Sequence, residues 1–402
     1  MSDRLTRRRF IGAAAGLVAG GSLVKTALAA ADGIHLGQQP AGLPDRQHAW
    51  QSTLAADEHG NAIAPKFDRL IFFDVAGHPG QSSIRTLEAT LRSLERRYPW
   101  GPKGLLFTVG WGPAYFKTIA GVASPVPEPT ALSDFELPTF DRYHAVIHLA
   151  ADDERRLAHV EAGLVENVRG VLAHRETRTG FTGAGLPAAR QVVNGIPSGD
   201  PVPTSAPLFM GFKSGLRKNQ ASESDVTIAS GALAGGTTMH VSYMRLRLDS
   251  WYDVLDERER VARMYGPELT PRDVARLTDD ARGDPGRYRQ DALRYGVVGH
   301  SQTSARARRK GRPLILRRDF DTIDDGVAGL HFVALQRSIA DFVATRKAMN
   351  ASSAATLNPA ITDTVNNGIN EFIFVLRRAN FAVPPRATRS FPLLPGQAAA
   401  LR

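Results

Sequence analysis

The sequence predicts an α+β fold in which two halves of the chain repeat the order β-α-β-β-α-β. Three observations support this prediction. Each half contains short apolar runs typical of buried strands and two helical segments with one apolar face. Each half also carries one long polar insertion, at residues 113–140 and 265–311. The β-α-β-β-α-β order is that of ferredoxin-like units, so we expect two such units with antiparallel sheets packed against helices.

The first half begins with an apolar strand at residues 67–75. A helix that starts at Ser82 or Ser83 follows and ends before Pro99, because serine caps helix starts and proline prevents continuation. A second helix starts at Asp152 or Asp153. The other expected strands of this half lie at residues 104–110, 143–150 and 207–212.

The second half repeats this order. Clear alternation predicts a strand at residues 239–248. Helices are expected at residues 251–264 and 339–349. The remaining strands are expected at residues 312–317, 329–336 and 371–376.

The N-terminal residues have the features of an export signal. Three arginines, Arg7 to Arg9, precede a short apolar run, which leads into the small residues Ala27-Leu28-Ala29. Paired arginines before Phe10 are typical of a twin-arginine signal, so we expect export by that machinery to the periplasm or the medium. Retention as an uncleaved membrane anchor is the alternative.

Composition and length limit the remaining possibilities. The 402 residues contain no cysteine, which excludes disulfides, iron–sulfur clusters and cysteine nucleophiles. The net charge of +10 comes mainly from arginine, but no nucleic-acid motif accompanies it, so we expect no nucleic-acid partner. The expected division is a signal peptide (1–29), an N-terminal surface segment (30–65), and two ferredoxin-like domains (66–213 and 214–402), the second binding the cofactor.

Common catalytic and nucleotide-binding motifs are missing from the sequence, including the HExxH, Walker A and GxSxG patterns. His144 and His148 fall on one face of a predicted strand, with a spacing that could serve a metal. Two histidines without a carboxylate are more often solvent-facing.

Several segments in order resemble the dye-decolourising peroxidase family, which comprises haem proteins built from two ferredoxin-like units in a barrel-like α+β superfamily. The resemblance covers most of the chain after the signal. It is carried by residues 211–215 (GFKSG), His300, residues 316–319 (LRRD) and 329–336 (GLHFVALQ), and more loosely by residues 110–116, 235–251 and 366–374.

The resemblance implies one haem b per chain and a role for several residues. His300 matches the histidine that ligates the haem iron, and Arg317 matches the distal arginine. Leu330, Phe332 and Gly215 match residues around the haem. Without the resemblance, a histidine such as His300 is more often a hydrogen-bonded loop residue than a metal ligand. Arg317 is then equally a surface arginine at a strand end, and Leu330 and Phe332 are ordinary core residues.

One position departs from the family pattern. The family has Gly-x-x-Asp-Gly, whose aspartate moves a proton between the peroxide oxygens, whereas this chain has Ser214. A serine hydroxyl is a poor base at neutral pH. Asp319, two residues after Arg317, is our candidate for the missing carboxylate, because strand alternation turns both side chains the same way. The alternative is an exposed carboxylate paired with Arg318.

The resemblance therefore implies a haem peroxidase that reduces hydrogen peroxide and oxidises an organic electron donor. The change at Ser214 keeps a second interpretation open, a non-catalytic haem-binding protein on a degenerate peroxidase fold. A structural protein without haem is the third. The sequence does not determine the oligomeric state, and a homo-oligomer is compatible with it.

Overall fold

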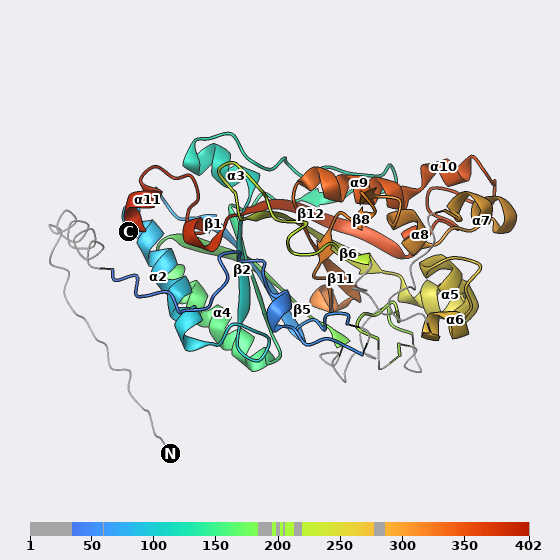
Figure 1. The fold of residues 1–402 in the computed structure, drawn as a ribbon, viewed down its shortest axis with the longest axis horizontal. Helices are drawn as coiled ribbons and strands as arrows, with labels where there is room; N and C mark the ends of the chain where they lie inside the picture. The colour runs from blue at the N-terminus through green and yellow to red at the C-terminus, as the bar shows by residue number, and fades with distance from the viewer. Residues whose placement is uncertain are drawn as a thin grey trace, which may run out of the picture.

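The computed structural model describes residues 34–58, 60–183, 195–197, 202–203, 206–212, 219–276 and 286–401. The predicted signal peptide (1–29) and the predicted domain boundary at 213/214 lie outside these residues. Within them, both halves of the chain contribute strands to one sheet, with helices packed at its two ends (Figure 1).

The first half forms four long antiparallel strands in the order β5-β1-β4-β2. Strand β1 pairs with β5 along its whole length and with β4 from Phe67 to Phe73. Its central residues 70–73 are apolar and buried on both faces of the sheet. The strands of this half are β1 (Phe67–Val75), β2 (Leu106–Trp111), β4 (Ala145–Ala151), β5 (Leu172–Phe181) and the short β3 (Thr139–Phe140).

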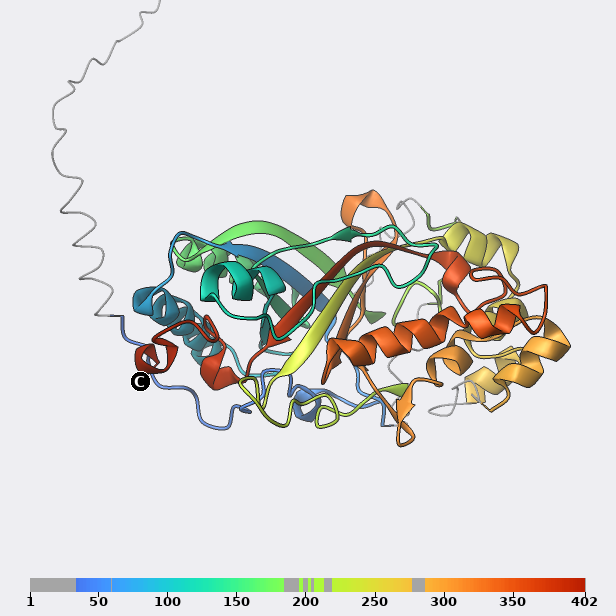
Figure 2. The same cartoon turned by 90° about the horizontal axis from the view of Figure 1, so that it is seen from above.

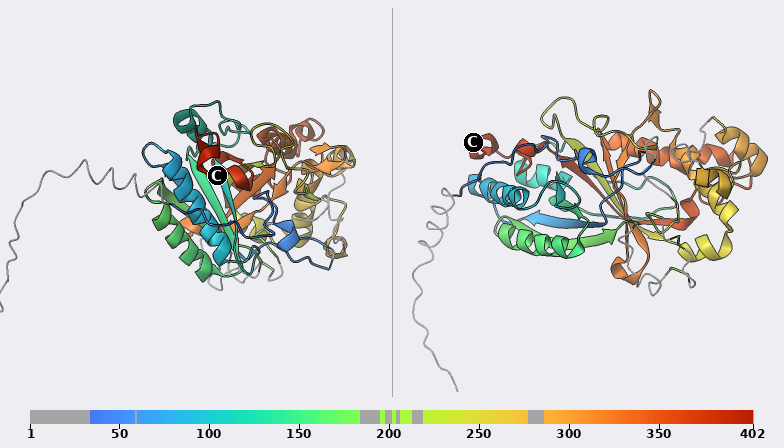
Figure 3. Two further views of the ribbon diagram at one scale, coloured as in Figure 1. Left: turned by 60° about the vertical axis from the view of Figure 1, so that its left-hand side comes forward. Right: turned by 60° about the horizontal axis from the view of Figure 1, so that its bottom comes forward.

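Two helices cover this sheet and lie side by side (Figures 1 and 3). Helix α2 (Gln81–Arg97) ends before Pro99, as its sequence predicts. Its predicted start at Ser82 or Ser83 is wrong, because Gly80 occupies the N-cap and the Ser83 hydroxyl accepts a hydrogen bond from the Gly80 amide. Helix α4 (Glu154–Val168) is capped by the Asp153 side chain, which accepts a hydrogen bond from the Arg156 amide. Short helical turns complete this half: η1 (Gln51–Thr53), α3 (Pro113–Tyr115) and η2 (Phe116–Ala120).

The second half adds the strands that complete the sheet. Helix α9 (Ile339–Asn350) packs along two of them, β6 and β11 (Figure 2). The strands of this half are β6 (Thr237–Leu246), β7 (Arg308–Arg309), β8 (Arg312–Pro313), β9 (Leu316–Arg317), β10 (Phe320–Thr322), β11 (Gly329–Gln336) and β12 (Ile373–Val383).

Short helices gather at the end of the molecule opposite α2 and α4 (Figure 1). They are α5 (Glu257–Met264), α6 (Pro271–Arg276), α7 (Tyr288–Tyr295), α8 (His300–Ser304) and α10 (Ser352–Ala355). The other helical turns are η6 (Ser250–Val254), η7 (Asp324–Gly326), η8 (Asn370–Phe372), η9 (Arg386–Thr388) and α11 (Gln397–Ala400).

The sheet closes on itself. Its order is β10-β5-β1-β4-β2-β12-β6-β11-β9, and β10 pairs with β11 as well as with β5. Single residue pairs join the long strands of the two halves, Ala382 with Trp111 on one side and Asp321 with Phe181 on the other. The short strand β3 also pairs with β12, in parallel, through Thr139 and Phe140. The predicted α+β class with antiparallel strands is therefore confirmed. In the described part of the chain, no helix has the length and apolar character needed to cross a bilayer.

The predicted strand at residues 207–212 is wrong. This apolar segment is buried, but it forms turns, because Gly211 has a φ of +81° and the Phe209 amide donates to the Asp321 side chain. Strand β5 closes the first half instead. Its apolar pattern is interrupted by charged residues such as Arg175 and Glu176, so periodicity alone does not reveal it.

The segment expected to lie on the surface at residues 30–65 is partly buried. Residues 47–50 are inaccessible to solvent. The Gln47 side chain donates to the carbonyl oxygens of Val109 and Pro384 and accepts from the Val109 amide. These bonds hold the segment against both halves of the barrel.

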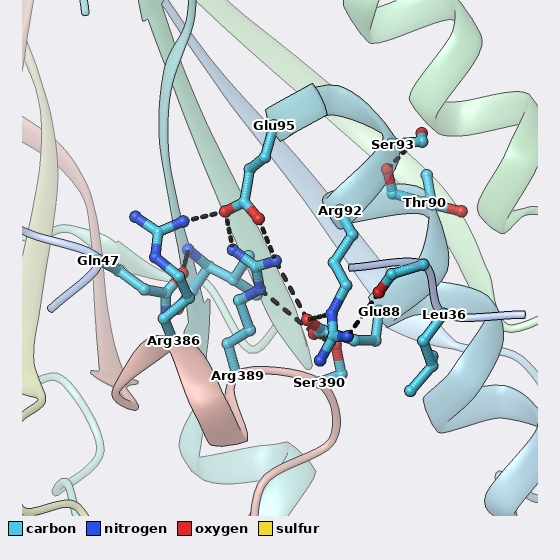
Figure 4. A network of polar contacts seen from close by, with 12 residues as sticks. Leu36, Gln47, Glu88, Thr90, Arg92, Ser93, Glu95, Arg386, Arg389 and Ser390 are labelled. Carbon is cyan, nitrogen blue, oxygen red and sulfur yellow. Dashed lines mark hydrogen bonds and ion pairs between the residues drawn. The ribbon is translucent and has the colours of Figure 1, made fainter. Parts of the chain in front are cut away.

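A buried ionic cluster ties the C-terminal residues to α2 (Figure 4). Glu95 contacts both Arg386 and Arg389, and its carboxylate oxygens lie 2.5 and 3.1 Å from the Arg389 guanidinium nitrogens. Arg389 also donates to Glu88 over 3.2 and 3.3 Å. Ser390 donates to Glu88 over 2.8 Å. All four charged side chains are at most 3 % exposed.

We expect Arg389→Ala to lower the free energy of unfolding by about 3–5 kcal/mol, because it leaves two buried carboxylates short of a cation. Equilibrium urea unfolding measures this change. Arg169→Ala removes a partner from the exposed pair with Glu166 and should cost less than about 1 kcal/mol. Equal losses in the two variants would contradict a special role for the cluster.

Candidate functional site

A cavity of about 180 Å³ lies between the strands of the second half and the helices α8 and α9. It is lined by five of the residues singled out in the sequence: His300, Arg317, Asp319, Leu330 and Phe332. The other two, Ser214 and Gly215, lie outside the described residues. The structure thus brings residues from three separate segments to one cavity.

Close backbone packing fixes the position of His300. It is the first residue of α8, and Gly299 caps the helix. A Cβ on Gly299 would lie 2.3 Å from the Tyr265 carbonyl, so only glycine fits there. On the other side, Gly368 adopts a φ of +56°, and a Cβ there would lie 3.0 Å from His300 Cα. These contacts hold the imidazole at the wall of the cavity.

His300 is neutral at physiological pH. Burial lowers the pKa of its imidazole to about 3, and the positive charges of Arg317 and Arg346 lower it further. A neutral imidazole is the form that binds a metal ion. The surroundings of His300 therefore favour the ligand-competent state.

Arg317 is held by the backbone of β9. It pairs with Ala334 of β11, and its amide donates to the Gln220 side chain over 2.5 Å. Its Nη1 lies 3.5 Å from Asp319 Oδ2, and its side chain is 21 % exposed. The guanidinium is therefore a fixed positive charge at the cavity wall.

Asp319 is a buried carboxyl group beside Arg317. Its side chain is 5 % exposed, and Oδ1 has no hydrogen-bond partner among the described residues. Burial raises its pKa to about 6, although Arg317 opposes this shift. The Arg318 side chain does not contact Asp319. Its Nη2 instead donates a hydrogen bond to the His48 carbonyl oxygen over 2.6 Å. The exposed Asp319–Arg318 pair considered as an alternative is therefore not formed.

Two buried arginines of the cavity were not identified from the sequence, Arg346 and Arg378. Both contact Glu136, with Arg378 Nη2 2.8 Å from each carboxylate oxygen. The sequence pattern could have indicated Arg346, because this residue lies on the same helix face as the apolar residues Phe342 and Met349. Among the described residues, positively charged side chains outnumber negatively charged ones in the cavity lining. The lining includes the arginines at positions 308, 317, 346 and 378 and one carboxylate, Asp319.

Comparisons with other proteins place the chain in a family. The sequence profile of a family of unknown function, DUF7405, matches residues 65–385. The chain belongs to this family. No curated protein has a significant match to the sequence of this DUF7405 member.

Solved structures with the same fold are DyP-type peroxidases. One from Cellulomonas bogoriensis is 22 % identical, with a TM-score of 0.55 over 84 % of this chain and 96 % of that one. One from Bacteroides thetaiotaomicron is 13 % identical, with a TM-score of 0.55 over 88 % and 100 %. A DypB variant from Rhodococcus jostii RHA1 in complex with haem is 13 % identical, with a TM-score of 0.56 over 86 % and 97 %. At these identities the likeness establishes the fold of the DUF7405 member.

The paired histidines of the sequence do not meet at a metal site. In the DUF7405 member, His148 is buried and its Nε2 lies 2.8 Å from Asp68 Oδ1. His144 Nδ1 accepts a hydrogen bond from the Val75 amide. Among the described residues, no group of three or more histidine, aspartate or glutamate side chains could hold a metal ion.

The raised pKa of Asp319 gives a pH-dependent stability. The folded protein keeps this proton up to a pH of about 6, whereas an unfolded aspartate releases it at about 3.9. The free energy of unfolding should therefore fall as the pH rises from about 4 to about 6, and Asp319→Asn should lack this fall. The variant should gain about 2–3 kcal/mol relative to the parent protein across this range.

Urea unfolding of both proteins between pH 4 and 7.5 (about the range of the titration) measures this difference. Asp152→Asn, a change at a carboxylate outside the cavity, serves as the control. Parallel pH profiles for the parent protein and Asp319→Asn would contradict the assignment.

Proposed function

We propose that the protein is a haem-dependent peroxidase of the dye-decolourising type, which reduces hydrogen peroxide and oxidises an organic donor. One observation carries this proposal. A single cavity is lined by a neutral, partly buried imidazole, a guanidinium and a carboxyl group whose pKa is about 6. The fold shared with DyP-type peroxidases supports it, because one of those structures is described in complex with haem.

The chemistry of the cavity walls fits a haem group. Haem combines an apolar macrocycle with two carboxylates, and the cavity combines apolar walls with an excess of arginine. Arg378 Nε and Asp319 Oδ1 are buried polar atoms without partners among the described residues. His300 would ligate the iron, and Leu330 and Phe332 would contact the macrocycle.

The volume of the cavity sets one requirement. At about 180 Å³ it is smaller than the roughly 300 Å³ at which pockets for drug-sized ligands begin. Binding of a group as large as haem therefore requires lining side chains to move apart.

The bound haem would supply the iron at which peroxide is reduced and to which the organic donor returns electrons. Arg317 would offset the negative charge that develops on oxygen as the O–O bond breaks. Asp319 would accept a proton from one peroxide oxygen at Oδ1 and return it to the other. A carboxyl group with a pKa of about 6 can do both near neutral pH.

The first test is haem binding itself. Titration of the protein with haem should give a Soret band, and His300→Ala should shift it or abolish it, because the iron loses its ligand. His174→Ala, at an exposed histidine, is the matched control and should leave the spectrum unchanged. A spectrum that His300→Ala does not alter would reject this histidine as the ligand.

The second test is reaction with peroxide. Stopped-flow absorption should show roughly 10²–10³-fold slower reaction for Arg317→Leu. Asp319→Asn should slow it roughly 10²–10⁴-fold, because the proton acceptor is lost. Reactivity that survives in Asp319→Asn but disappears in Ser214→Ala would assign the proton transfer to the serine position. If the absorption spectrum of the haem-bound parent protein does not change after peroxide is added, the non-catalytic haem-binding alternative is favoured.

A further inference from the structure

A basic hairpin forms part of the wall of the cavity near His300. Its strands β7 (Arg308–Arg309) and β8 (Arg312–Pro313) pair with each other and form a two-stranded sheet of their own. The turn between them consists of Lys310 and Gly311, whose φ angles are +50° and +77°. The hairpin projects from the body of the molecule (Figure 2).

The outer part of this hairpin is charged and exposed to solvent. The side chains of Arg309 and Arg312 are 53 % and 72 % exposed, and Lys310 is exposed as well. Asp341 contacts Arg309, and Asp225 Oδ1 lies 3.0 Å from Arg312 Nη1. The cations of residues 305–313 outnumber these two carboxylates. They are the side chains at positions 306, 308, 309, 310 and 312.

The same hairpin reaches the cavity. Residues 307, 308 and 313–315 are part of its lining. Arg308 Nη1 donates to the Gly311 carbonyl oxygen over 3.0 Å, which fixes the turn next to the lining residue. Lys310 follows Arg308 by two positions, so their Cα atoms are at most about 7.6 Å apart. The exposed turn therefore lies within about one Debye length of the cavity wall at physiological ionic strength, about 8 Å.

This placement matters for a ligand with negative charges. Haem has two carboxylates, and positive charges near the site of entry attract such a ligand before any contact forms. Attraction of this kind raises association rate constants by about 10–10³-fold and is screened by salt. Exposed charges of this type change the association rate more than the dissociation rate, which depends on the groups that contact the bound ligand.

We propose that the β7–β8 hairpin accelerates the entry of a dicarboxylate porphyrin into the cavity by electrostatic attraction. The charges that act are those of Arg309, Lys310 and Arg312. The inference rests on the haem binding proposed above, but it requires neither the bond between His300 and iron nor reaction with peroxide. It assigns the hairpin a role in loading the cavity, which is separate from the role of the residues that line it.

Stopped-flow fluorescence with protoporphyrin IX, the iron-free dicarboxylate, tests this proposal on the full chain produced without haem. At about 0.01 M salt, the triple variant Arg309→Gln/Lys310→Gln/Arg312→Gln should associate about tenfold more slowly than the parent protein. At about 1 M salt, where the Debye length is only about 3 Å, the two rates should become equal. The dissociation rate constant should change by less than about twofold. An unchanged dissociation rate also shows that the cavity is intact in the variant.

Two control variants separate the charge of the hairpin from other effects. Lys103→Gln/Arg155→Gln/Arg169→Gln removes three exposed cations of the first half that do not line the cavity, and it should leave the association rate within about twofold. Arg309→Lys/Arg312→Lys keeps the charge of the hairpin and should retain the rate of the parent protein. A slow rate in this lysine variant would assign the effect to guanidinium contacts and overturn the proposal.

Other results would also overturn the proposal. One is an equal association rate for the parent protein and the triple glutamine variant at low salt. Another is a difference between them that persists at about 1 M salt or is confined to dissociation. Failure of the parent protein to bind any porphyrin would reject both this inference and the proposed function. Porphyrin binding with the expected salt dependence, but without reaction of the haem complex with peroxide, would support the inference and reject the peroxidase activity alone.

Discussion

Strand β11 pairs with three other strands, and most of the candidate site depends on these pairs. It pairs with β6 along its length, with β10 at one end and with β9 near the other. Leu330 and Phe332 lie on β11 itself, and Arg317 lies on β9 opposite Ala334. Asp319 lies between β9 and β10, so both of its flanking strands are fixed by β11. A shift in register by one residue would turn Arg317 and Asp319 away from the cavity.

The same alternation explains the use of three consecutive charged residues, Arg317 to Asp319. Arg317 and Asp319 face the cavity near His300, whereas Arg318 contacts Trp50 and His48. One short segment therefore supplies charges to two separate spaces in the protein. Arg317 and Asp319 contact each other, whereas Arg318 contacts residues of the N-terminal segment.

Much of this arrangement could be predicted from the sequence. Helices α2, α4 and α9 and strands β1, β4 and β11 follow from periodicity and capping residues, because their cores are locally encoded. The grouping of His300 with Arg317 came from a family resemblance rather than from physical chemistry. Strand β5 could not be predicted, since its charged residues are balanced by partners far away in sequence, such as the buried bond from Arg178 to Asp141. A cleft of about 540 Å³ could not be predicted for the same reason, because it forms only where residues 50–57 and 60–66 lie against residues 316–319.

The ionic cluster at α2 has a consequence for the order of events during synthesis. Glu88 and Glu95 are translated before their partner Arg389, which follows them by 301 and 294 residues in the sequence. Until Arg386 and Arg389 are made, burial of the Glu95 carboxylate is unfavourable, because both of its cationic partners are missing, whereas Glu88 already has Arg92 four residues away. Strand β12, which closes the barrel against β2, also emerges late. The first half of the chain therefore completes its native packing only after β12 and residues 386–389 have been made, because these residues supply its last buried contacts.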